Sequence, residues 1–293
     1  MRKNKKVLIT GGGGFIGKHL TNLLIGKGYK VSLLDKSDKS IPSGVKIFKG
    51  DVCNPDVVAK AMKGMDYVYH LAGLLGTEEL LFNTAEAVKI NVIGAVNVME
   101  EAAKNKTKLL LVSKPNPWLN TYSITKETSE KFCMMFRKEF GLKAAIVKWF
   151  SVYGPGQKHY GVQKAVPTFI VAALKGEQLP VFDRGQQTAD FIYTSDAVRA
   201  TVEVAETPAA EGQIVEIGTG EETKIIDLAK MIIKMTGSKS KIKFLKMRKG
   251  EDLGSHVVAD IRLLKRFTKL KPEIDLETGM RETIDYYREI IKE

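Results

Sequence analysis

Cysteines are scarce in this sequence, and long hydrophobic runs are missing. Only two of the 293 residues are cysteine, and Cys53 and Cys133 are isolated from each other and from any pair of histidines. Their isolation excludes a disulfide framework and a zinc-ligand pattern, so we expect no metal site and a reducing, cytoplasmic setting. The basic start of the chain leads into an apolar run that stops at Ile9, which is too short for an export signal. Since no run approaches about 18 apolar residues, we also expect no membrane span.

Acidic residues are fewer than basic ones, and 46 Lys and Arg against 34 Asp and Glu give a net charge of +12. An excess of this size can mark a surface for nucleic acid, for a membrane or for an anionic small substrate. No basic tract is interleaved with aromatic residues, so we expect no nucleic-acid partner. The basic residues are scattered and alternate with acids, which indicates a lysine-rich solvated surface. General attraction of a phosphorylated substrate is the alternative.

Glycine is concentrated at one point, where an apolar run at residues 7–9 gives way to a pattern with helical spacing. Residues 10–17 read Thr-Gly-Gly-Gly-Gly-Phe-Ile-Gly, which places glycines at a corner between a strand and a helix. Gly11 permits a tight turn, Gly14 lets backbone N–H groups approach a pyrophosphate, and Gly17 lets helix and strand pack closely. Because the start of a helix favours negative charge, this corner predicts a phosphate cradle.

An acidic residue follows the glycine corner at the spacing of a dinucleotide site. Residues 30–34 form a second predicted strand, which ends in Asp35 about 20 residues after the corner. A carboxylate at this place accepts hydrogen bonds from the hydroxyl groups of an adenosine ribose. Together, the corner and the acid predict a dinucleotide-binding unit.

The rest of the first half alternates strands with helices. The predicted strands cover residues 45–49, 66–70, 108–113 and 143–150, and the predicted helices cover 56–62, 84–104 and 121–140. This alternation predicts an α/β fold with a doubly wound, mostly parallel sheet over residues 1–151. Ligands of such sheets bind at the carboxyl ends of the strands. The residues that fall there are Gly11, Asp35, Asp51, Leu71 to Gly73, Ser113, Phe150 and Ser151.

The pattern changes after Ser151. Shorter strands and amphipathic helices follow, without an internal repeat or a low-complexity linker. We expect residues 189–218 to return to the dinucleotide-binding domain. Residues 152–188 and 219–293 then form a smaller carboxyl-terminal lobe, which packs over the sheet edge and closes a substrate cleft.

Tyr122 and Lys126 are the pair that carries chemistry in this arrangement. They lie four apart at the start of the helix predicted over 121–140, so both side chains project from one face. A free tyrosine has a pKa of about 10, and its use as a base near neutral pH requires that this pKa falls by several units. A neighbouring ammonium and an oxidised nicotinamide both favour the phenolate. The pair therefore predicts proton transfer beside a nicotinamide cofactor.

These motifs give the sequence a family resemblance that covers nearly the whole chain. It is similar to the extended short-chain dehydrogenase/reductases, and among them to NAD-dependent nucleotide-sugar epimerases and dehydratases such as UDP-glucose 4-epimerase. Besides the glycine corner, the matching motifs are Gly-Asp-Val at 50–52, His-Leu-Ala-Gly at 70–73, Asn-Val-Ile-Gly at 91–94, Tyr-Ser-Ile-Thr-Lys at 122–126, Phe-Ser-Val-Tyr-Gly-Pro at 150–155, Gln-Thr-Ala-Asp-Phe at 187–191, Ile-Gly-Thr-Gly at 217–220 and Arg-Lys-Gly-Glu at 248–251. The resemblance implies a Rossmann sheet and a nucleotide-diphosphate sugar as substrate.

The resemblance also implies a mechanism and a cofactor. Tyr122 would take the proton from a sugar hydroxyl while hydride passes to NAD, and Lys126 would bind the nicotinamide ribose. An epimerase then returns the hydride to the other face of the keto sugar, whereas in a dehydratase water leaves first. Asp35 favours NAD over NADP because its carboxylate would repel a 2′-phosphate, and the neighbouring Lys36 weakens this preference. The implied cofactor contacts are Gly11, Gly14, Phe15, Ile16, Gly17, Asp35, Lys36, Asp51, Val52, Leu71, Ala72, Gly73, Leu74, Asn91, Tyr122, Lys126 and Phe150.

The sequence departs from the family beside the reactive tyrosine. Members usually carry a Ser or Thr about two dozen residues before that tyrosine, and its hydroxyl group hydrogen-bonds the reacting group of the substrate. Here Ser113 lies only nine positions before Tyr122, and an ungapped comparison places Pro115 where the hydroxyl is expected. We take Ser113 as the candidate for this catalytic donor, with Thr121 as the alternative.

Two positions of the substrate site also differ from the family. Ser151 stands where epimerases commonly have Asn, and Ala189 stands where they have Arg. Both family residues serve the nucleotide diphosphate. Arg248 is retained and can pair bidentately with phosphate. We therefore assign Ser151 and Arg248 to the substrate site.

Three functions stay open on these observations. The first is a nucleotide-sugar epimerase or dehydratase with an altered substrate pocket. The second is an NAD-dependent dehydrogenase or reductase of another alcohol or ketone, and the third is a non-catalytic dinucleotide-binding protein. The intact Tyr122 and Lys126 argue against the third, and the second lobe with Arg248 favours the first over the second.

We also expect a homodimer. The helices predicted over 84–104 and 121–140 would pair with those of a second copy into a four-helix interface, as members of this family often do. The same apolar stripe could instead face the sheet. The candidate contacts are Val88, Val92, Phe132 and Phe136.

Overall fold

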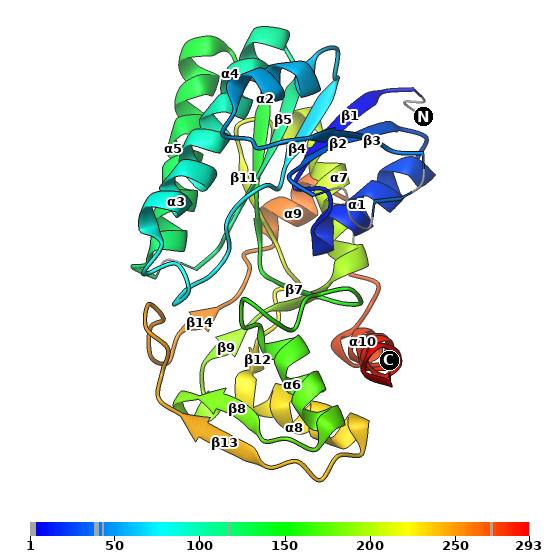
Figure 1. Ribbon diagram of the computed structural model, residues 1–293, viewed down its shortest axis with the longest axis vertical. Helices are drawn as coiled ribbons and strands as arrows, with labels where there is room; N and C mark the ends of the chain where they lie inside the picture. Colours follow the sequence, from blue (N-terminus) through cyan, green and yellow to red (C-terminus); the bar gives the residue numbers. More distant parts are fainter. Residues whose placement is uncertain (1–3, 38–40, 43, 117, 270–271, 293) are drawn as a thin grey trace.

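The apolar runs of the first half pair side by side in one central sheet. The computed structural model describes residues 4–37, 41–42, 44–116, 118–269 and 272–292 (Figure 1). Within these residues, seven parallel strands follow the order β11-β6-β5-β4-β1-β2-β3. They are β1 (Lys6–Thr10), β2 (Lys30–Asp35), β3 (Lys46–Lys49), β4 (Tyr67–His70), β5 (Lys108–Ser113), β6 (Ala144–Trp149) and β11 (Ile214–Ile217). The predicted doubly wound parallel sheet is thereby confirmed.

Helices cover both faces of this sheet (Figure 1). One face carries α1 (Phe15–Gly26), α7 (Thr194–Glu206) and α9 (Arg262–Phe267), and the other carries α2 (Pro55–Met62), α4 (Gly94–Asn105) and α5 (Thr121–Phe140). Successive strand residues enter different cores: Val7 and Ile9 pack with Leu20 of α1, whereas Leu8 packs with Val58 of α2. Because both faces are covered, the strands have continuous apolar sequences rather than alternating ones.

The strand order reverses between β1 and β4, where the predicted ligand edge lies. From β1 the chain moves outward through β2 and β3, and it then crosses back to β4 on the other side of β1. Thr10, at the end of β1, lies opposite Leu34 on one side and His70 on the other. Sheets of this kind bind ligands in the crevice outside such a reversal. The expected ligand edge therefore lies next to the glycine corner.

The helix predicted over 84–104 is continuous but irregular. α3 (Thr84–Val88) leads into a π-helical segment, η1 (Lys89–Ile93), which leads into α4. A π-helical turn holds more residues than an α-helical turn, so it rotates the side chains on its two sides relative to each other. Val88 is consequently 41% exposed, whereas Val92 is only 7% exposed.

Short strands and further helices form the second lobe, which Figure 1 shows below the sheet. α6 (Ala165–Lys175), α8 (Ile225–Thr236) and α10 (Leu276–Lys292) share an apolar core with the paired strands β8 (Leu179–Phe182) and β13 (Ile242–Leu245). The remaining elements are β7 (Ser151–Tyr153) paired with β10 (Phe191–Tyr193), the strands β9 (Thr188–Ala189), β12 (Thr223–Lys224) and β14 (His256–Val257), and the short turns η2 (Asp183–Gly185) and η3 (Pro208–Ala210). Among the helices of the described residues, none is long and apolar enough to cross a bilayer.

A buried carboxylate connects the sheet with the second lobe. Asp190 is fully buried and accepts hydrogen bonds from the backbone N–H groups of Thr219 (2.8 Å), Gly220 (2.8 Å) and Ala259 (3.3 Å). The hydroxyl group of Thr219 donates a fourth bond at 2.7 Å. A Cβ on Gly218 would lie 2.4 Å from the carboxylate, so this position requires glycine. The motifs at 187–191 and 217–220 therefore belong to one structural network.

Candidate active site

The glycine corner leaves the start of α1 open to an anion. Gly11 has a φ of +71°, and a Cβ there would lie 2.8 Å from the backbone nitrogen of Ala72. A Cβ on Gly17 would lie 2.7 Å from the carbonyl oxygens of Gly11 and Gly12. Gly14 takes the N-cap position, without a side-chain cap and without an acid in the first turn. No side chain of the helix therefore competes with a phosphate for its N-terminus.

Asp35 lies beside this corner and is held by backbone donors. Its Oδ2 accepts from the N–H group of Gly13 at 2.9 Å, and its Oδ1 accepts from that of Ser37 at 3.1 Å. Both oxygens keep lone pairs for the hydroxyl groups of a ribose. Lys36 turns instead to Asp51, with 2.9 Å between its Nζ and Oδ2, and this hydrogen bond raises the pKa of Lys36. Lys36 is thus engaged with Asp51, and it weakens the preference of Asp35 for NAD less than we expected.

The other predicted cofactor contacts line the same edge of the sheet. Phe15 and Ile16 begin α1 and are partly buried. Val52 is buried, and its carbonyl oxygen accepts from Asn97 Nδ2 at 2.9 Å. Leu71, Ala72 and Gly73 follow β4 directly, and Phe150 follows β6. The structure therefore brings the predicted cofactor residues to one crevice.

Asn91, a predicted cofactor contact, uses its amide group for hydrogen bonds within the protein. Its Oδ1 accepts from the N–H group of Leu74 at 2.7 Å, and its Nδ2 donates to the carbonyl oxygen of Leu74 at 3.1 Å. The same Nδ2 donates to Thr125 Oγ1 at 3.1 Å, on the first turns of α5. Asn91 thereby fixes the loop after β4 to the helix of Tyr122. Its direct contact with the cofactor stays a prediction.

Tyr122 and Lys126 project from the first two turns of α5. Asn120 caps this helix, since its Oδ1 accepts from the N–H group of Ser123 at 2.9 Å. Lys126 is 5% exposed, and burial lowers its pKa to about 8, although Glu130 opposes the change. Burial raises the pKa of Tyr122 to about 12. Burial thus favours the neutral phenol of Tyr122.

His70 is a buried group at this edge that was not among the predicted site residues. Its Nδ1 lies 2.8 Å from Thr10 Oγ1, which also accepts from the N–H group of Ala72 at 3.2 Å. Its Nε2 has no partner among the described residues. Burial, with the charge of Lys126, lowers the pKa of His70 to about 3, so the ring is neutral. The His-Leu-Ala-Gly motif was the signal for this network, which fixes the loop after β4.

Ser113, the predicted catalytic donor, is already hydrogen-bonded within the protein. Its hydroxyl group is buried and donates to Glu130 Oε1. The other carboxylate oxygen of Glu130 lies 3.2 Å from Nζ of Lys148. Donation from Ser113 to a substrate would require that the bond to Glu130 breaks. The predicted alternative is Thr121, whose hydroxyl oxygen lies 3.0 Å from that of Thr84, within hydrogen-bond distance.

Lys114 is the side chain that lies next to Tyr122, and sequence reasoning missed it. It is only 7% exposed, and its Nζ donates to Ser123 Oγ at 2.7 Å. The same Nζ lies 5.3 Å from the ring centroid of Tyr122 and 5.3 Å from that of Trp118. The ring of Trp118 thus covers the ammonium group of Lys114. The sequence alone did not reveal this contact. Pro117, the second proline of this connection, lies outside the described residues.

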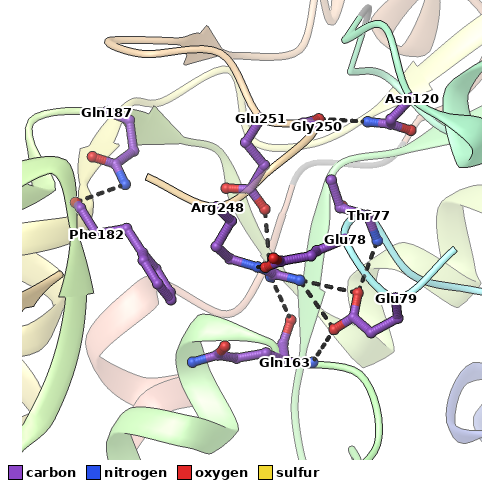
Figure 2. Close-up of polar contacts among 10 residues, drawn as sticks. All are labelled: Thr77, Glu78, Glu79, Asn120, Gln163, Phe182, Gln187, Arg248, Gly250 and Glu251. Atoms are coloured by element: carbon purple, nitrogen blue, oxygen red, sulfur yellow. Dashed lines mark hydrogen bonds and ion pairs between the residues drawn. The ribbon is translucent and has the colours of Figure 1, made fainter. Parts of the chain in front are cut away.

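Arg248, the predicted phosphate ligand, faces carboxylates in the cleft (Figure 2). Its Nη2 donates to both carboxylate oxygens of Glu79 at 3.0 Å. Its Nη1 lies 3.4 Å from Glu251 Oε1 and 3.5 Å from the carbonyl oxygen of Gln163, and its Nε lies 3.8 Å from Glu78 Oε2. Burial alone would raise the pKa of Glu79, but backbone N–H donors and Arg248 lower it. The guanidinium is therefore already neutralised by protein groups.

The loop of Arg248 also contacts the start of α5. Asn120 Nδ2 donates to the carbonyl oxygen of Gly250 at 2.7 Å (Figure 2). The cap of the helix that carries Tyr122 is thus bonded to the second lobe.

Ser151, the other predicted substrate residue, begins β7 and donates its backbone N–H to the carbonyl oxygen of Asp190 at 2.9 Å. Its side chain is partly buried beside the same crevice.

A family model described as "NAD dependent epimerase/dehydratase family" matches residues 7–218 of the chain. The match covers well over half of the sequence and includes the glycine corner, Tyr122 and Lys126. The protein belongs to this family. The predicted resemblance is thereby confirmed, and with it the prediction of an enzyme that uses NAD.

Relatives of this epimerase/dehydratase are similar over their full lengths. UDP-N-acetyl-alpha-D-glucosaminuronate decarboxylase of Bacillus cytotoxicus is 31% identical over 98% of this chain and 98% of its own. The UDP-glucose 4-epimerase of Thermotoga maritima, solved with UDP-glucose, has a TM-score of 0.93 at 26% identity and covers 98% of this chain and 99% of its own. The UDP-glucuronic acid 4-epimerase of Bacillus cereus was solved with UDP-glucuronic acid and NAD. It has a TM-score of 0.90 at 27% identity and covers 97% of this chain and 99% of its own.

The residues of this family member fit NAD. Gly11 and Gly17 leave no room for a Cβ, and the start of α1 carries neither an acid nor a side-chain cap. Asp35 presents a carboxylate that two backbone N–H groups hold in place. Lys126 is buried, and its ammonium has no ion pair among the described residues. An NAD molecule supplies the pyrophosphate, the ribose hydroxyl groups and the nicotinamide ribose that these groups are able to bind.

Proposed function

We propose that this protein is a nucleotide-sugar epimerase or dehydratase that acts by transient oxidation of a sugar hydroxyl. The observation that carries the proposal is the placement of Tyr122 and Lys126 on the first two turns of α5, beside a crevice that fits NAD. The relatives named above act on UDP-sugars, and this supports a UDP-sugar as the substrate class.

Tyr122 is the proposed proton acceptor. It would take the proton from the oxygen of the sugar hydroxyl, and NAD, when bound, would accept the hydride from the carbon atom that bears this hydroxyl. The positive charge of the cofactor, with the ammonium of Lys126, favours the phenolate against the burial that raises its pKa to about 12. Lys126 holds the nicotinamide ribose and keeps the phenolate oriented. When the hydride returns to the sugar, Tyr122 gives the proton back to the oxygen.

Arg248 and Ser151 are the proposed groups for the nucleotide diphosphate. Ala189 offers no charge at the position where epimerases commonly have Arg, so Arg248 carries more of the binding. The start of α6 adds backbone donors nearby, since the N–H group of Gln163 donates to Glu79 at 3.2 Å. Ser113 is the proposed donor to the reacting hydroxyl once its bond to Glu130 opens.

Two features of the assembly belong to this proposal. We propose that a second copy pairs along α4 and α5, because Val96, Phe132, Met135 and Phe140 line a groove on their outer side. Val92 and Phe136 are each 7% exposed and belong to the core, so Val88 and Phe132 are the better candidate contacts. A cytoplasmic setting agrees with the two free thiols of Cys53 and Cys133.

The test is incubation of the purified protein and NAD with a panel of UDP-sugars, with product mass and stereochemistry as readouts. Unchanged mass with inversion of one hydroxyl identifies an epimerase. Loss of water identifies a dehydratase, and loss of carbon dioxide identifies a decarboxylase. A stoichiometric change of two hydrogens, with net formation of NADH, would identify the alternative dehydrogenase and contradict the proposal.

The proposed domain boundaries follow the chain through the sheet. Residues 1–151 form the dinucleotide-binding domain, and residues 189–218 return to it. β11 pairs with β6 at Ile217 and Trp149, and α7 packs against α1, which supports this return. Residues 152–188 and 219–293 form the proposed substrate lobe, apart from α9, which packs on the sheet.

A further inference from the structure

Lys114 directs an ammonium group at the reactive tyrosine. It follows Ser113, the last residue of β5, and its side chain is almost completely buried. Its Nζ lies over the rings of Trp118 and Tyr122, at 5.3 Å from each centroid. A hydrogen bond of 2.7 Å to Ser123 Oγ fixes it against the first turn of α5. The ammonium therefore lies against the ring of the residue that is proposed to take the proton of the sugar.

In the part of the chain that the structure describes, this ammonium has no direct ion pair. Among the described residues, no carboxylate oxygen lies within 4.0 Å of Nζ. Burial lowers the pKa of Lys114 to about 8, and repulsion from Lys164 adds to this, against longer-range attraction from Glu127 and Glu251. Burial of an unpaired charge is unfavourable, and buried charges in proteins are normally paired. The missing partner is thus an anion that does not belong to the chain.

We propose that Lys114 selects a sugar that carries a carboxylate and binds this carboxylate beside Tyr122. This inference rests on the proposed function, and it narrows the substrate class to a nucleoside-diphosphate uronate. The neutral hydroxymethyl group of an ordinary hexose leaves the ammonium unpaired, whereas a carboxylate supplies the absent charge and accepts its remaining N–H groups.

The position of Lys114 argues against the diphosphate as its partner. Tyr122 has to reach the hydroxyl group that is oxidised, so the sugar ring is the part of the substrate that lies next to Tyr122 and Lys114. The diphosphate has a separate set of cations in the second lobe. There Arg248 contacts the carbonyl oxygen of Gln163, and Lys164 is the next residue, at the N-cap of α6.

The experiment compares two probes that differ in one group, UDP-glucuronate and UDP-glucose, as substrates of the wild-type protein with NAD. We expect the wild type to prefer UDP-glucuronate in kcat/KM by at least about tenfold. Lys114→Met should lower kcat/KM for UDP-glucuronate by roughly 10- to 100-fold more than it lowers kcat/KM for UDP-glucose. Lys114→Arg, which keeps the charge, should retain the preference for UDP-glucuronate.

The matched control is Lys164→Met. Because both probes carry the same diphosphate, this variant should lower kcat/KM for both by the same factor. Equal losses for both probes in Lys114→Met, or a wild type without preference, would overturn the inference while the proposed function stands. If the wild type turns over neither probe but converts another nucleotide sugar of the panel, this inference fails and the proposed function stands. NAD titration and a melting curve of each variant separate loss of fold from loss of selectivity.

Discussion

Arg248 and Glu79 are 169 positions apart in the chain, and Nη2 of Arg248 donates to both carboxylate oxygens of Glu79 at 3.0 Å. Glu79 also accepts from the backbone N–H groups of Thr77 and Gln163. Its carboxylate thus occupies the donors that the proposed function assigns to a phosphate. A substrate has to displace Glu79 before Arg248 can bind its diphosphate.

Glu79→Gln is therefore expected to tighten substrate binding. The two N–H groups bond to different oxygens of Glu79, so the amide keeps an acceptor for only one of them. It also loses the charge that holds Arg248, so KM for the nucleotide sugar should fall by about 3- to 10-fold. Steady-state kinetics at constant NAD measure this change. The control is Glu78→Gln, because Glu78 lies 3.8 Å from the same guanidinium and is more exposed. A rise of KM in Glu79→Gln would show that Glu79 supports binding rather than opposes it.

Tyr122→Phe is expected to bind NAD as the wild type does and to lose turnover by roughly 10²- to 10⁴-fold, because a proton acceptor is removed without loss of the ring. Fluorescence titration with NAD and product formation from a UDP-sugar measure the two effects. Tyr160→Phe serves as the control, since Tyr160 is 64% exposed and its ring lies against His159. Activity near that of the wild type in Tyr122→Phe would remove Tyr122 from the mechanism.

Asp35→Ala is expected to narrow the gap between NAD and NADP. The change removes the acceptor for the ribose hydroxyl groups and also the charge that repels a 2′-phosphate, so NAD should bind about tenfold more weakly while NADP binds no worse. Dissociation constants for both cofactors measure the gap, with Asp56→Ala on α2 as the control. Tighter binding of NADP than of NAD by the wild type would contradict the role of Asp35.

The stability difference between Lys114→Met and the wild type should depend on pH. Burial places the pKa of Lys114 near 8 in the folded protein, below its ordinary 10.5, so its destabilising charge is absent at high pH. Stability is lost as the pH falls from 10.5 through 8, and the loss reaches ~3 kcal/mol at most. In urea unfolding of the cofactor-free protein, Lys114→Met should therefore gain most on the wild type near about pH 7 and less near about pH 9.5. A gain that does not change with pH would mean that the pKa of Lys114 is the same in the folded and the unfolded protein.

Phe132→Asp is expected to convert a dimer into a monomer. Phe132 is 37% exposed on the outer side of α5, in the groove assigned to a second copy, and a buried carboxylate there would have no partner. Light scattering after gel filtration measures the mass in solution. Phe244→Asp, on β13 in the other lobe, should leave the mass unchanged. A wild type that is monomeric at micromolar concentration would exclude the dimer.

Local signals were sufficient for the framework. α5 begins and ends where the sequence predicted, at Thr121 and Phe140, because Asn120 supplies an N-terminal cap and Gly141 takes a φ of 66° at the other end. The strands were found as apolar runs, and the parallel sheet followed from their alternation with helices. The glycine corner was read correctly as a turn because Gly11 needs a positive φ.

The substrate side could not be predicted in the same way. Lys114 is a charged residue, and charged residues are mostly exposed, so nothing local to residues 113–116 indicated that its side chain turns inward. The pairing of Arg248 with Glu79 depends on how two loops from different lobes meet. Ser113 was identified by its place at the end of β5, but its hydroxyl group is used by Glu130, two helical turns beyond Tyr122.

The π-helical segment over Lys89–Ile93 makes the active site sensitive to the length of the chain rather than only to its composition. Deletion of one residue there would let residues 84–105 close into an ordinary α-helix, with every side chain chemically intact. The deletion would also turn Asn91 away from Leu74 and Thr125, and so release the loop after β4 from the helix that bears Tyr122. One residue of helix length thus decides whether the loop after β4 stays aligned with the helix of Tyr122.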